Sequence, residues 1–208
     1  MPTLCPDELR QVSRDTLQHY EEKAADFWAA TKDHDVTQNY QALLGALPNK
    51  VGLDILDFGC GPGRDLLYFK NAGHHAVGLE GSPRFCEMAK TFSGCEVLQQ
   101  DFLNLQLPPE GFDGIFANAS LFHVPSQELA RVLRELWVAL RPGGVLFSSN
   151  PRGTEEGWDG SRYGTFMEFE PYQAYLEAAG FRVEQHYYRP AGQPRAEQPW
   201  LAVVSRKP

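Results

Sequence analysis

Residues 53–65 read LDILDFGCGPGRD, and this stretch decides the fold. The apolar run from Leu53 to Phe58 has the length of a buried strand, and it ends directly in a turn with three glycines before a helical pattern begins. Glycine lets the backbone approach a ligand closely, and the amino terminus of a helix favours a negatively charged group. The stretch therefore predicts a strand, a ligand-binding turn and a helix. Taken alone, it suits a dinucleotide equally well.

Further apolar runs of strand length alternate with helical stretches along the chain. They lie at residues 75–79, 96–98, 114–116 and 145–148. This alternation is typical of βαβ units, in which consecutive strands run parallel. The sequence therefore predicts an α/β fold with a doubly wound, mostly parallel sheet.

The last third of the chain predicts a different strand pairing. A helix over residues 169–179 ends at Gly180, and two strands follow at 181–188 and 200–205. The path between these strands, residues 190–198, suits an antiparallel pair better than a crossover. We expect the sheet to end in a hairpin.

The first 47 residues are polar and amphipathic, unlike the segments that follow. Apolar residues recur near helical spacing from Val12 to Trp28, which predicts a helix that packs one face on a larger body. Asp35 followed by Gln38 resembles a capping box, which places a second helix at about 36–46, ended by Pro48. We expect a helical cap over residues 1–47 and the main domain over 48–208, together forming one structural unit.

Composition excludes several classes of function. The chain has 208 residues, and 19 Lys plus Arg stand against 27 Asp plus Glu, a formal net charge of -8. This charge repels phosphate backbones, so we do not expect a nucleic-acid partner. No apolar run reaches the roughly 18 residues that a bilayer span needs, so we expect no membrane association and a cytoplasmic location. The four cysteines are too widely spaced for a C-x-x-C pair, and we expect no metal site.

Two acids downstream of the glycine-rich turn narrow the choice of ligand. Arg64 stands where a dinucleotide fingerprint has its third glycine. Glu80, at the end of the second predicted strand, places a carboxylate where two ribose hydroxyls are bridged. Asp101 follows the third strand, where it accepts a hydrogen bond from an adenine amino group, and Phe102 beside it covers the ring face.

At these positions the sequence resembles the class I S-adenosylmethionine-dependent methyltransferases. The matching motifs are LDFGCGPGRD, Glu80, Asp101 and LRPGGVLFSS at residues 140–149, and the resemblance covers about residues 50–205. It implies a seven-stranded sheet with a reversed last strand, and S-adenosylmethionine lying across the carboxyl ends of the first strands. The cofactor-binding residues that it implies are Tyr20, Trp28, Asp57, Gly59, Cys60, Gly61, Arg64, Glu80, Gly81, Ser82, Asp101, Phe102, Asn118 and Ala119.

A closer resemblance concerns five further stretches: YEEKAADFW, DHDVTQN, FANASLFHVPSQEL, SNPRGTEEGWDGSRYG and HYYRPAGQPRAEQPWLA. They look like the methyltransferase domain attached to, or encoded beside, the ovothiol-forming sulfoxide synthases. That domain methylates a ring nitrogen of 5-thiohistidine. The resemblance implies a small-molecule substrate and a functional pairing with a sulfoxide synthase.

Substrate-handling residues are expected after the fourth strand, in a long polar loop over residues 150–165 that follows the fifth strand, and in the final hairpin. His123 is expected to act as a base or to orient the substrate, although a histidine hydrogen-bonded in the pocket wall explains the position equally well. Tyr163 is the second catalytic candidate. One of Tyr187 and Tyr188 should point into the core, because side chains alternate along a strand. The predicted substrate residues are Asn39, Asn150, Arg152, Trp158, Arg162, Tyr187 and Arg189.

The leading hypothesis is an enzyme that transfers a methyl group to a nitrogen of a small amino-acid-like metabolite. No Asn-Pro-Pro-aromatic run follows the fourth strand, which speaks against methylation of nucleic-acid bases, and no glutamate pair follows it, which speaks against protein arginine as the acceptor. Three alternatives remain open. They are another nitrogen, oxygen or sulfur acceptor, a non-catalytic cofactor-binding partner protein, and an NAD-dependent oxidoreductase.

Overall fold

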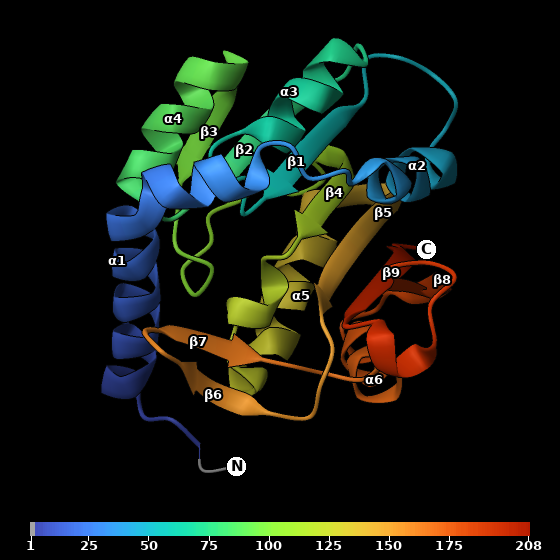
Figure 1. Ribbon diagram of the computed structural model, residues 1–208. Coiled ribbons are helices and arrows are strands. Elements are labelled where there is room, and N and C mark those ends of the chain that lie inside the picture. Colours follow the sequence, from blue (N-terminus) through green and yellow to red (C-terminus); the bar gives the residue numbers. More distant parts are fainter. Residues whose placement is uncertain (1–2) are drawn as a thin grey trace.

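A computed structural model describes residues 3–208 and has a seven-stranded sheet in the order β3-β2-β1-β4-β5-β9-β8 (Figure 1). The first five of these strands run parallel, and β9 runs antiparallel to both β5 and β8. The predicted α/β class and the terminal hairpin are confirmed. The strands are β1 (Asp54–Phe58), β2 (His75–Glu80), β3 (Glu96–Gln99), β4 (Phe112–Asn118), β5 (Leu140–Pro151), β8 (Arg182–Arg189) and β9 (Trp200–Arg206).

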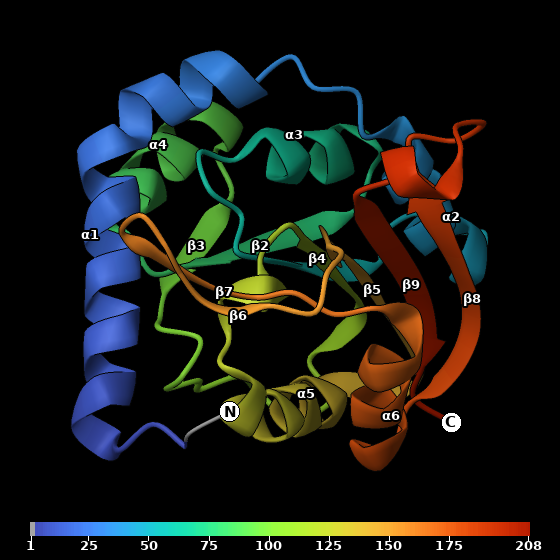
Figure 2. The ribbon, with the colours of Figure 1, turned by 60° about the horizontal axis from the view of Figure 1, so that its bottom comes forward.

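Helices cover both faces of this sheet, as a doubly wound fold requires. Figure 2 shows α2, α3 and α4 on one face and α5 and α6 on the other. The α-helices are α1 (Pro6–Thr31), α2 (Thr37–Ala46), α3 (Arg64–Asn71), α4 (Pro83–Ser93), α5 (Ser126–Ala139) and α6 (Phe169–Ala178), and two short 3₁₀ turns are η1 (Leu121–His123) and η2 (Arg195–Glu197).

Two apolar clusters, one on each face, hold the helices to the sheet. Alternation along β4 sends Phe116 into the cluster under α2 and α3, whereas Ile115 and Ala117 enter the cluster under α5 and α6. All three side chains are fully buried. Burying a phenylalanine side chain contributes about 1.5–3 kcal/mol to the free energy of folding. A slip of one residue would move these side chains to the opposite face of the sheet, so side-chain burial fixes the strand register together with the backbone hydrogen bonds.

The two N-terminal helices pack differently. In Figure 1, α1 runs along β7 and then bends across α4, whereas α2 lies beside β5 and packs against β4, β5 and β9. Tyr40 and Leu43 of α2 belong to the buried cluster under that face. The capping box predicted for α2 does not form: the Asp35 carboxylate accepts a hydrogen bond from the Thr37 backbone at 2.9 Å, but the N-cap residue is Val36.

The polar segment after β5, predicted as a loop over 150–165, folds instead as an antiparallel ribbon. Its strands are β6 (Glu156–Asp159) and β7 (Arg162–Thr165), and β5 itself continues to Pro151. The ribbon crosses the carboxyl edge of the sheet (Figure 2). The Tyr163 backbone amide donates to Thr16 Oγ1 of α1 at 3.0 Å, so the ribbon and α1 are joined over this edge.

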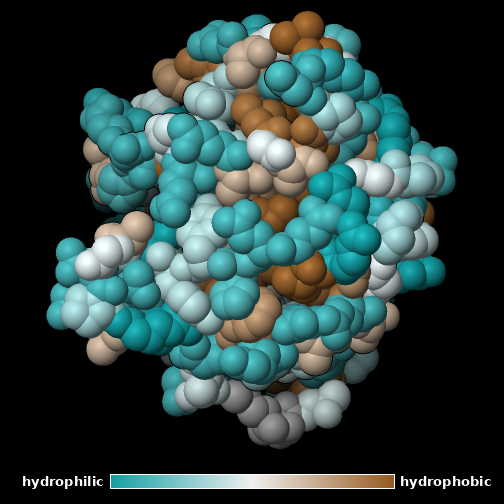
Figure 3. Space-filling view, turned by 90° about the vertical axis from the view of Figure 1, so that its right-hand side faces the viewer, coloured by the Kyte–Doolittle hydropathy of each residue, from teal (hydrophilic) through white to brown (hydrophobic). Residues whose placement is uncertain are grey.

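The outer surface shows where polar side chains gather. The side of the molecule that carries α2 and β8 is mostly hydrophilic, with hydrophobic residues in separate areas between hydrophilic ones (Figure 3). None of the helices within residues 3–208 combines the length and the apolar content that a membrane span requires.

The glycine-rich turn brings α3 very close to α4. Gly63 precedes α3 with φ at 95°, and a Cβ atom added there would lie 2.8 Å from the Ala89 Cα of α4. A residue with a side chain therefore faces both backbone strain and a clash with a second backbone.

Gly63→Ala should lower the free energy of unfolding by about 3 kcal/mol or more, because the strain and the clash add. Gly143→Ala is the matched control, since Gly143 also has a positive φ of 80° but has no atom within 4 Å of an added Cβ. Its cost should be about 1 kcal/mol. Urea unfolding of the two variants checks this, and equal losses would show that the contact between the turn and α4 is not tight.

Candidate functional site

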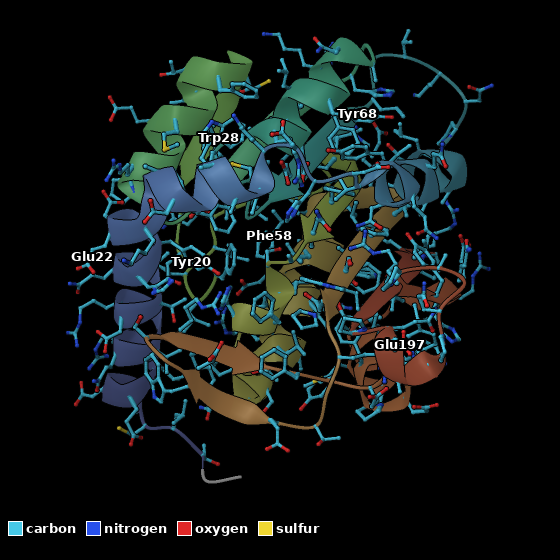
Figure 4. All side chains as sticks on the ribbon, in the orientation of Figure 1. Tyr20, Glu22, Trp28, Phe58, Tyr68 and Glu197 are labelled. Atoms are coloured by element: carbon cyan, nitrogen blue, oxygen red, sulfur yellow. The ribbon has the colours of Figure 1, made fainter. Side chains whose placement is uncertain are left out.

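A cavity of about 640 Å³ lies at the carboxyl edge of the sheet. Its walls come from the glycine-rich turn, the ends of β2 and β4, and the inner face of α1. Figure 4 shows Tyr20 pointing inward from α1, whereas Glu22 on the same helix points outward. The cavity therefore lies under the roof that α1 and the ribbon form.

Glu80 lies on the wall of this cavity at the end of β2. Its carboxylate accepts hydrogen bonds from the backbone amides of Gly61 at 3.1 Å, Gly81 at 2.7 Å and Ser82 at 2.9 Å. Burial raises the pKa of Glu80, and the three amides act in the opposite direction. Oε1 accepts two of these bonds and Oε2 accepts one, so Oε2 keeps an acceptor site that suits a ribose hydroxyl.

Asp101 and Phe102 form the wall next to Glu80. Asp101 accepts hydrogen bonds from the Ser13 hydroxyl and, at 2.8 Å, from the Leu103 amide. The Phe102 ring stacks on Phe58 with ring centres 4.2 Å apart. A flat aromatic wall beside an acceptor carboxylate fits an adenine ring with an exocyclic amino group.

Gly59 keeps the space between these groups open. With φ at 78°, a Cβ there would lie 2.5 Å from Ser120 Cβ and 3.0 Å from the Phe102 ring. The absence of a side chain therefore lets the turn close against Phe102, and the cradle fits the adenosine part of S-adenosylmethionine.

Arg64 and Asp65 close the cavity on the far side of the turn. Arg64 forms a double hydrogen bond with the Asp65 carboxylate, at 2.6 and 3.0 Å, and a third with the Thr31 carbonyl at 2.9 Å. Tyr40 donates to the same carboxylate at 2.5 Å. Sequence reasoning proposed Arg64 and missed Asp65, although Asp65 completes the quoted motif and occupies the first turn of α3.

Asn118 and Ala119 line the cavity at the end of β4. The Asn118 side chain accepts a hydrogen bond from the Asn39 amide at 2.9 Å. Ala119 has φ at 60°, a conformation that residues with a Cβ rarely adopt and that is found where a loop is tightly constrained. Asn39, predicted as a substrate residue, is fully buried and holds Asn118 from behind.

Two residues predicted to contact the cofactor do not line the cavity. Asp57 is buried behind the glycine-rich turn, and one of its carboxylate oxygens has no hydrogen-bond partner among the described residues. Burial holds the pKa of Asp57 well above its usual range. Ser82 caps α4 by accepting from the Phe85 amide at 3.2 Å, and it donates to Glu21 of α1 at 2.6 Å. Asp57 and Ser82 therefore support the loops that form the cavity wall without lining the cavity themselves.

His123 lies on the cavity wall and is held at both ring nitrogens. Nδ1 lies 2.7 Å from the Tyr163 carbonyl oxygen, which accepts only, so Nδ1 carries the proton. Nε2 therefore has a lone pair and accepts from the Tyr20 hydroxyl at 2.8 Å. Burial lowers the pKa of His123 to about 4. His123 is therefore a weak base. Its contact with the Tyr20 hydroxyl orients that side chain instead.

The Tyr163 side chain, predicted to be catalytic, points away from the cavity. Its hydroxyl donates to Glu156 at 3.0 Å, within the ribbon. What it contributes to the site is its carbonyl oxygen, which fixes the His123 tautomer. The side chain is on the other face of β7 because residues alternate along a strand.

The predicted substrate residues separate into two groups. Arg162 and Arg189 line the cavity. Arg152 instead pairs with Glu168 at 3.1 Å, and the Trp158 side chain lies 48% exposed on the ribbon. The Asn150 side-chain oxygen, Oδ1, accepts from the Phe122 backbone amide at 3.2 Å and thereby braces η1.

The prediction that either Tyr187 or Tyr188 enters the core is wrong. Both side chains are half-buried, on opposite faces of the edge strand β8. Tyr187 donates to Asn39 at 3.1 Å, and Tyr188 lies under the Arg195 guanidinium. An edge strand has no neighbour beyond it, so neither side chain is fully covered.

Trp200 lines the cavity and was missed. Because β9 runs against the other strands, its first residue lies at the edge where the parallel strands end. The predicted terminal hairpin could have indicated Trp200, because the first residue of a reversed last strand lies at the edge of the sheet that carries the site.

His123 should make stability fall as pH falls. The pKa of this base is about 4 in the folded protein and about 6.5 when unfolded, so the unfolded chain binds more protons between these values. The free energy of unfolding should be highest above pH 6.5 and should lose about 2 kcal/mol by about pH 5.

Urea unfolding of His123→Gln at about pH 7.5 and pH 5 tests this, because the variant should lose this part of the pH dependence. His75→Gln removes an exposed histidine and serves as the control. The same pH dependence in His123→Gln as in the wild type would contradict the buried, neutral ring.

Comparisons with known proteins agree with this geometry. Residues 55–144 match the methyltransferase domain family. The chain is 28% identical over 219 residues to the 27-O-demethylrifamycin SV methyltransferase of Amycolatopsis mediterranei, a match covering 92% of this chain and 78% of that protein. It is 32% identical over 107 residues to the sterol 24-C-methyltransferase of Aspergillus fumigatus, a match covering 47% of this chain and 27% of that protein. The chain thus spans only part of its curated relatives.

The fold is also similar to solved structures, among them one that aligns with the whole chain. The 1,6-didemethyltoxoflavin-N1-methyltransferase of Burkholderia thailandensis, solved with 1,6-didemethyltoxoflavin and S-adenosylhomocysteine, has a TM-score of 0.75 and is 23% identical, covering 100% of this chain and 92% of that one. At 23% identity, this similarity shows that the two proteins share a fold. Domain family and fold agree: residues 55–144 match the methyltransferase domain family, the chain has the fold of the S-adenosylmethionine-dependent methyltransferases, and S-adenosylmethionine is the cofactor that this domain and the cradle at Glu80 and Asp101 support.

Proposed function

We propose that this protein transfers a methyl group from S-adenosylmethionine to a ring nitrogen of a small heteroaromatic acceptor, a histidine derivative such as 5-thiohistidine. The observation that carries the proposal is the roofed cavity of about 640 Å³, within the range of small-molecule pockets. Glu80 and Asp101 line this cavity where β2 and β3 end, and Arg189 lines it at the end of β8. A macromolecular acceptor would have to displace α1 or the ribbon.

The chemistry of the wall favours nitrogen over a hydroxyl acceptor. The sulfonium of the cofactor supplies an already activated methyl group, so the protein has to orient a nucleophile and exclude water. A neutral imidazole has a free lone pair at physiological pH, since its ordinary pKa is about 6.5. An alcohol or phenol would need a base, and His123 is a poor one because its pKa is about 4 and Nε2 is engaged by Tyr20.

Tyr20 is the group that orients the acceptor in this proposal. Its proton is directed to His123, so its oxygen keeps acceptor lone pairs for a ligand in the cavity. An N–H group on the acceptor ring donates to this oxygen, which leaves the other ring nitrogen with its lone pair towards the methyl group. His123 acts as a positioning residue behind Tyr20.

Two of the matched proteins support a small acceptor. The rifamycin relative and the toxoflavin neighbour are both named for methyl transfer to small molecules, the second at a position called N1. The net charge of -8 opposes a nucleic-acid acceptor. The proposal includes functional pairing with a sulfoxide synthase and a cytoplasmic location, where free thiols such as the buried Cys60 and Cys86 stay reduced.

Turnover with methyl-labelled S-adenosylmethionine tests the proposal. Mass spectrometry should detect one labelled methyl group on 5-thiohistidine, with S-adenosylhomocysteine formed in equal amount. L-histidine and a primary amine serve as comparison acceptors, and Tyr20→Phe should lower kcat with 5-thiohistidine because the orienting oxygen is lost. A labelled O- or S-methyl product would move the reaction to another acceptor atom.

A non-catalytic cofactor-binding protein gives a different result. It would bind S-adenosylhomocysteine in calorimetry and form none from S-adenosylmethionine with any of these acceptors. That combination would reject methyl transfer to these compounds and keep the cofactor site.

A further inference from the structure

Arg189 stands apart from the other arginines of the cavity wall. Arg64 is paired with Asp65, and Arg162 is paired with Asp159 at 2.8 Å. Within residues 3–208, no carboxylate lies within ion-pair distance of Arg189. This guanidinium is therefore a positive charge on the cavity wall without a counter-ion from the described chain.

Most of the hydrogen-bonding capacity of Arg189 is also unused. Nη2 donates to Ser149 Oγ at 3.5 Å, a long and weak bond, and Nε is buried without any hydrogen-bond partner among the described residues. Burial lowers the pKa of Arg189, and the nearby Arg64 charge acts in the same direction. An unpaired buried charge is costly, and an anionic ligand would compensate it.

Trp200 lies beside Arg189 on the same wall. The two residues are directly opposite each other in the β8–β9 pair, and the guanidinium carbon is 5.9 Å from the Trp200 ring centre. Both line the cavity. A planar cation with free donors next to an aromatic face is a combination that suits a carboxylate attached to an apolar or aromatic group.

Strand order assigns this pair to the acceptor end of the cavity. Glu80 ends β2, whereas Arg189 ends β8, five strand spacings or about 24 Å farther along the sheet. The adenosine-type groups, Glu80 and Asp101, lie at the ends of β2 and β3. The intervening ends of β1, β4 and β5 separate them from Arg189 and Trp200.

We infer that Arg189 and Trp200 form a subsite for a carboxylate carried by the methyl acceptor. The two terminal nitrogens of Arg189 donate to the two carboxylate oxygens, and Trp200 packs against the apolar part of the same molecule. The inference rests on the proposed function and narrows its substrate class to heteroaromatic carboxylates, which include amino acids with a heterocyclic side chain.

Calorimetry with pairs of acids and amides tests the subsite without requiring turnover. Protein saturated with S-adenosylhomocysteine is titrated with L-histidine, 5-thiohistidine and imidazole-4-acetate, and with the primary amide of each. The preferred acid should bind roughly tenfold to a hundredfold more tightly than its amide. Arg189→Gln should remove this preference and leave amide binding unchanged, with Arg189→Lys retaining part of it.

Arg182→Gln is the matched control, because Arg182 is on the same strand but is exposed and pairs with Glu184 outside the cavity. It should keep the acid preference, and melting temperatures should show that all variants are folded. If no acid binds more tightly than its amide to the wild type, or if Arg189→Gln keeps the preference, the inference is wrong.

A second pair of ligands tests whether Arg189 binds the carboxylate of the acceptor or the carboxylate of the cofactor. S-adenosylhomocysteine carries an amino-acid carboxylate, and 5′-methylthioadenosine lacks it. Arg189→Gln should bind both as the wild type does. A selective loss of S-adenosylhomocysteine affinity would assign Arg189 to the cofactor and overturn the inference. Failure to methylate 5-thiohistidine, with the acid preference intact, would reject only the acceptor named in the proposed function.

Discussion

The Glu80 carboxylate ties together the two loops that follow β1 and β2. It accepts from Gly61 in the first loop and from Gly81 and Ser82 in the second, so both backbones are fixed around one buried charge. A buried acid has to find such donors, because leaving it without hydrogen bonds costs several kcal/mol, about the net stability of a domain. The shape of the cavity at its adenosine end follows from this single side chain.

The roof of the cavity is built from segments far apart in the sequence. Thr16 and Tyr20 of α1 meet the ribbon and η1 through hydrogen bonds to the Tyr163 amide and to His123. His123 is in turn fixed by the Tyr163 carbonyl oxygen. Removing one hydrogen bond in this series frees the next group. The orientation of Tyr20 therefore depends on the ribbon, although Tyr20 and the ribbon are far apart in the sequence.

Local patterns predicted the sheet, both helical layers and the terminal hairpin, because apolar periodicity and glycine-rich turns act over a few residues. The β6–β7 ribbon was not predicted, since its sequence is polar, lacks clear alternation and is stabilised by contacts with α1. The motif also marked Asp57 and Ser82, which lie behind the cavity wall, because sequence spacing does not distinguish a wall residue from the residue that supports it. Trp200 needed the direction of β9, a property of the whole sheet.

The central claim is that Glu80 belongs to an adenosine site, and calorimetric titration with S-adenosylhomocysteine tests it most directly. Glu80→Gln keeps the size of the side chain but replaces one acceptor oxygen, so binding should weaken by about 1–3 kcal/mol, while Glu87→Gln on the exposed side of α4 should bind as the wild type does. Wild-type affinity in a folded Glu80→Gln variant would contradict the account.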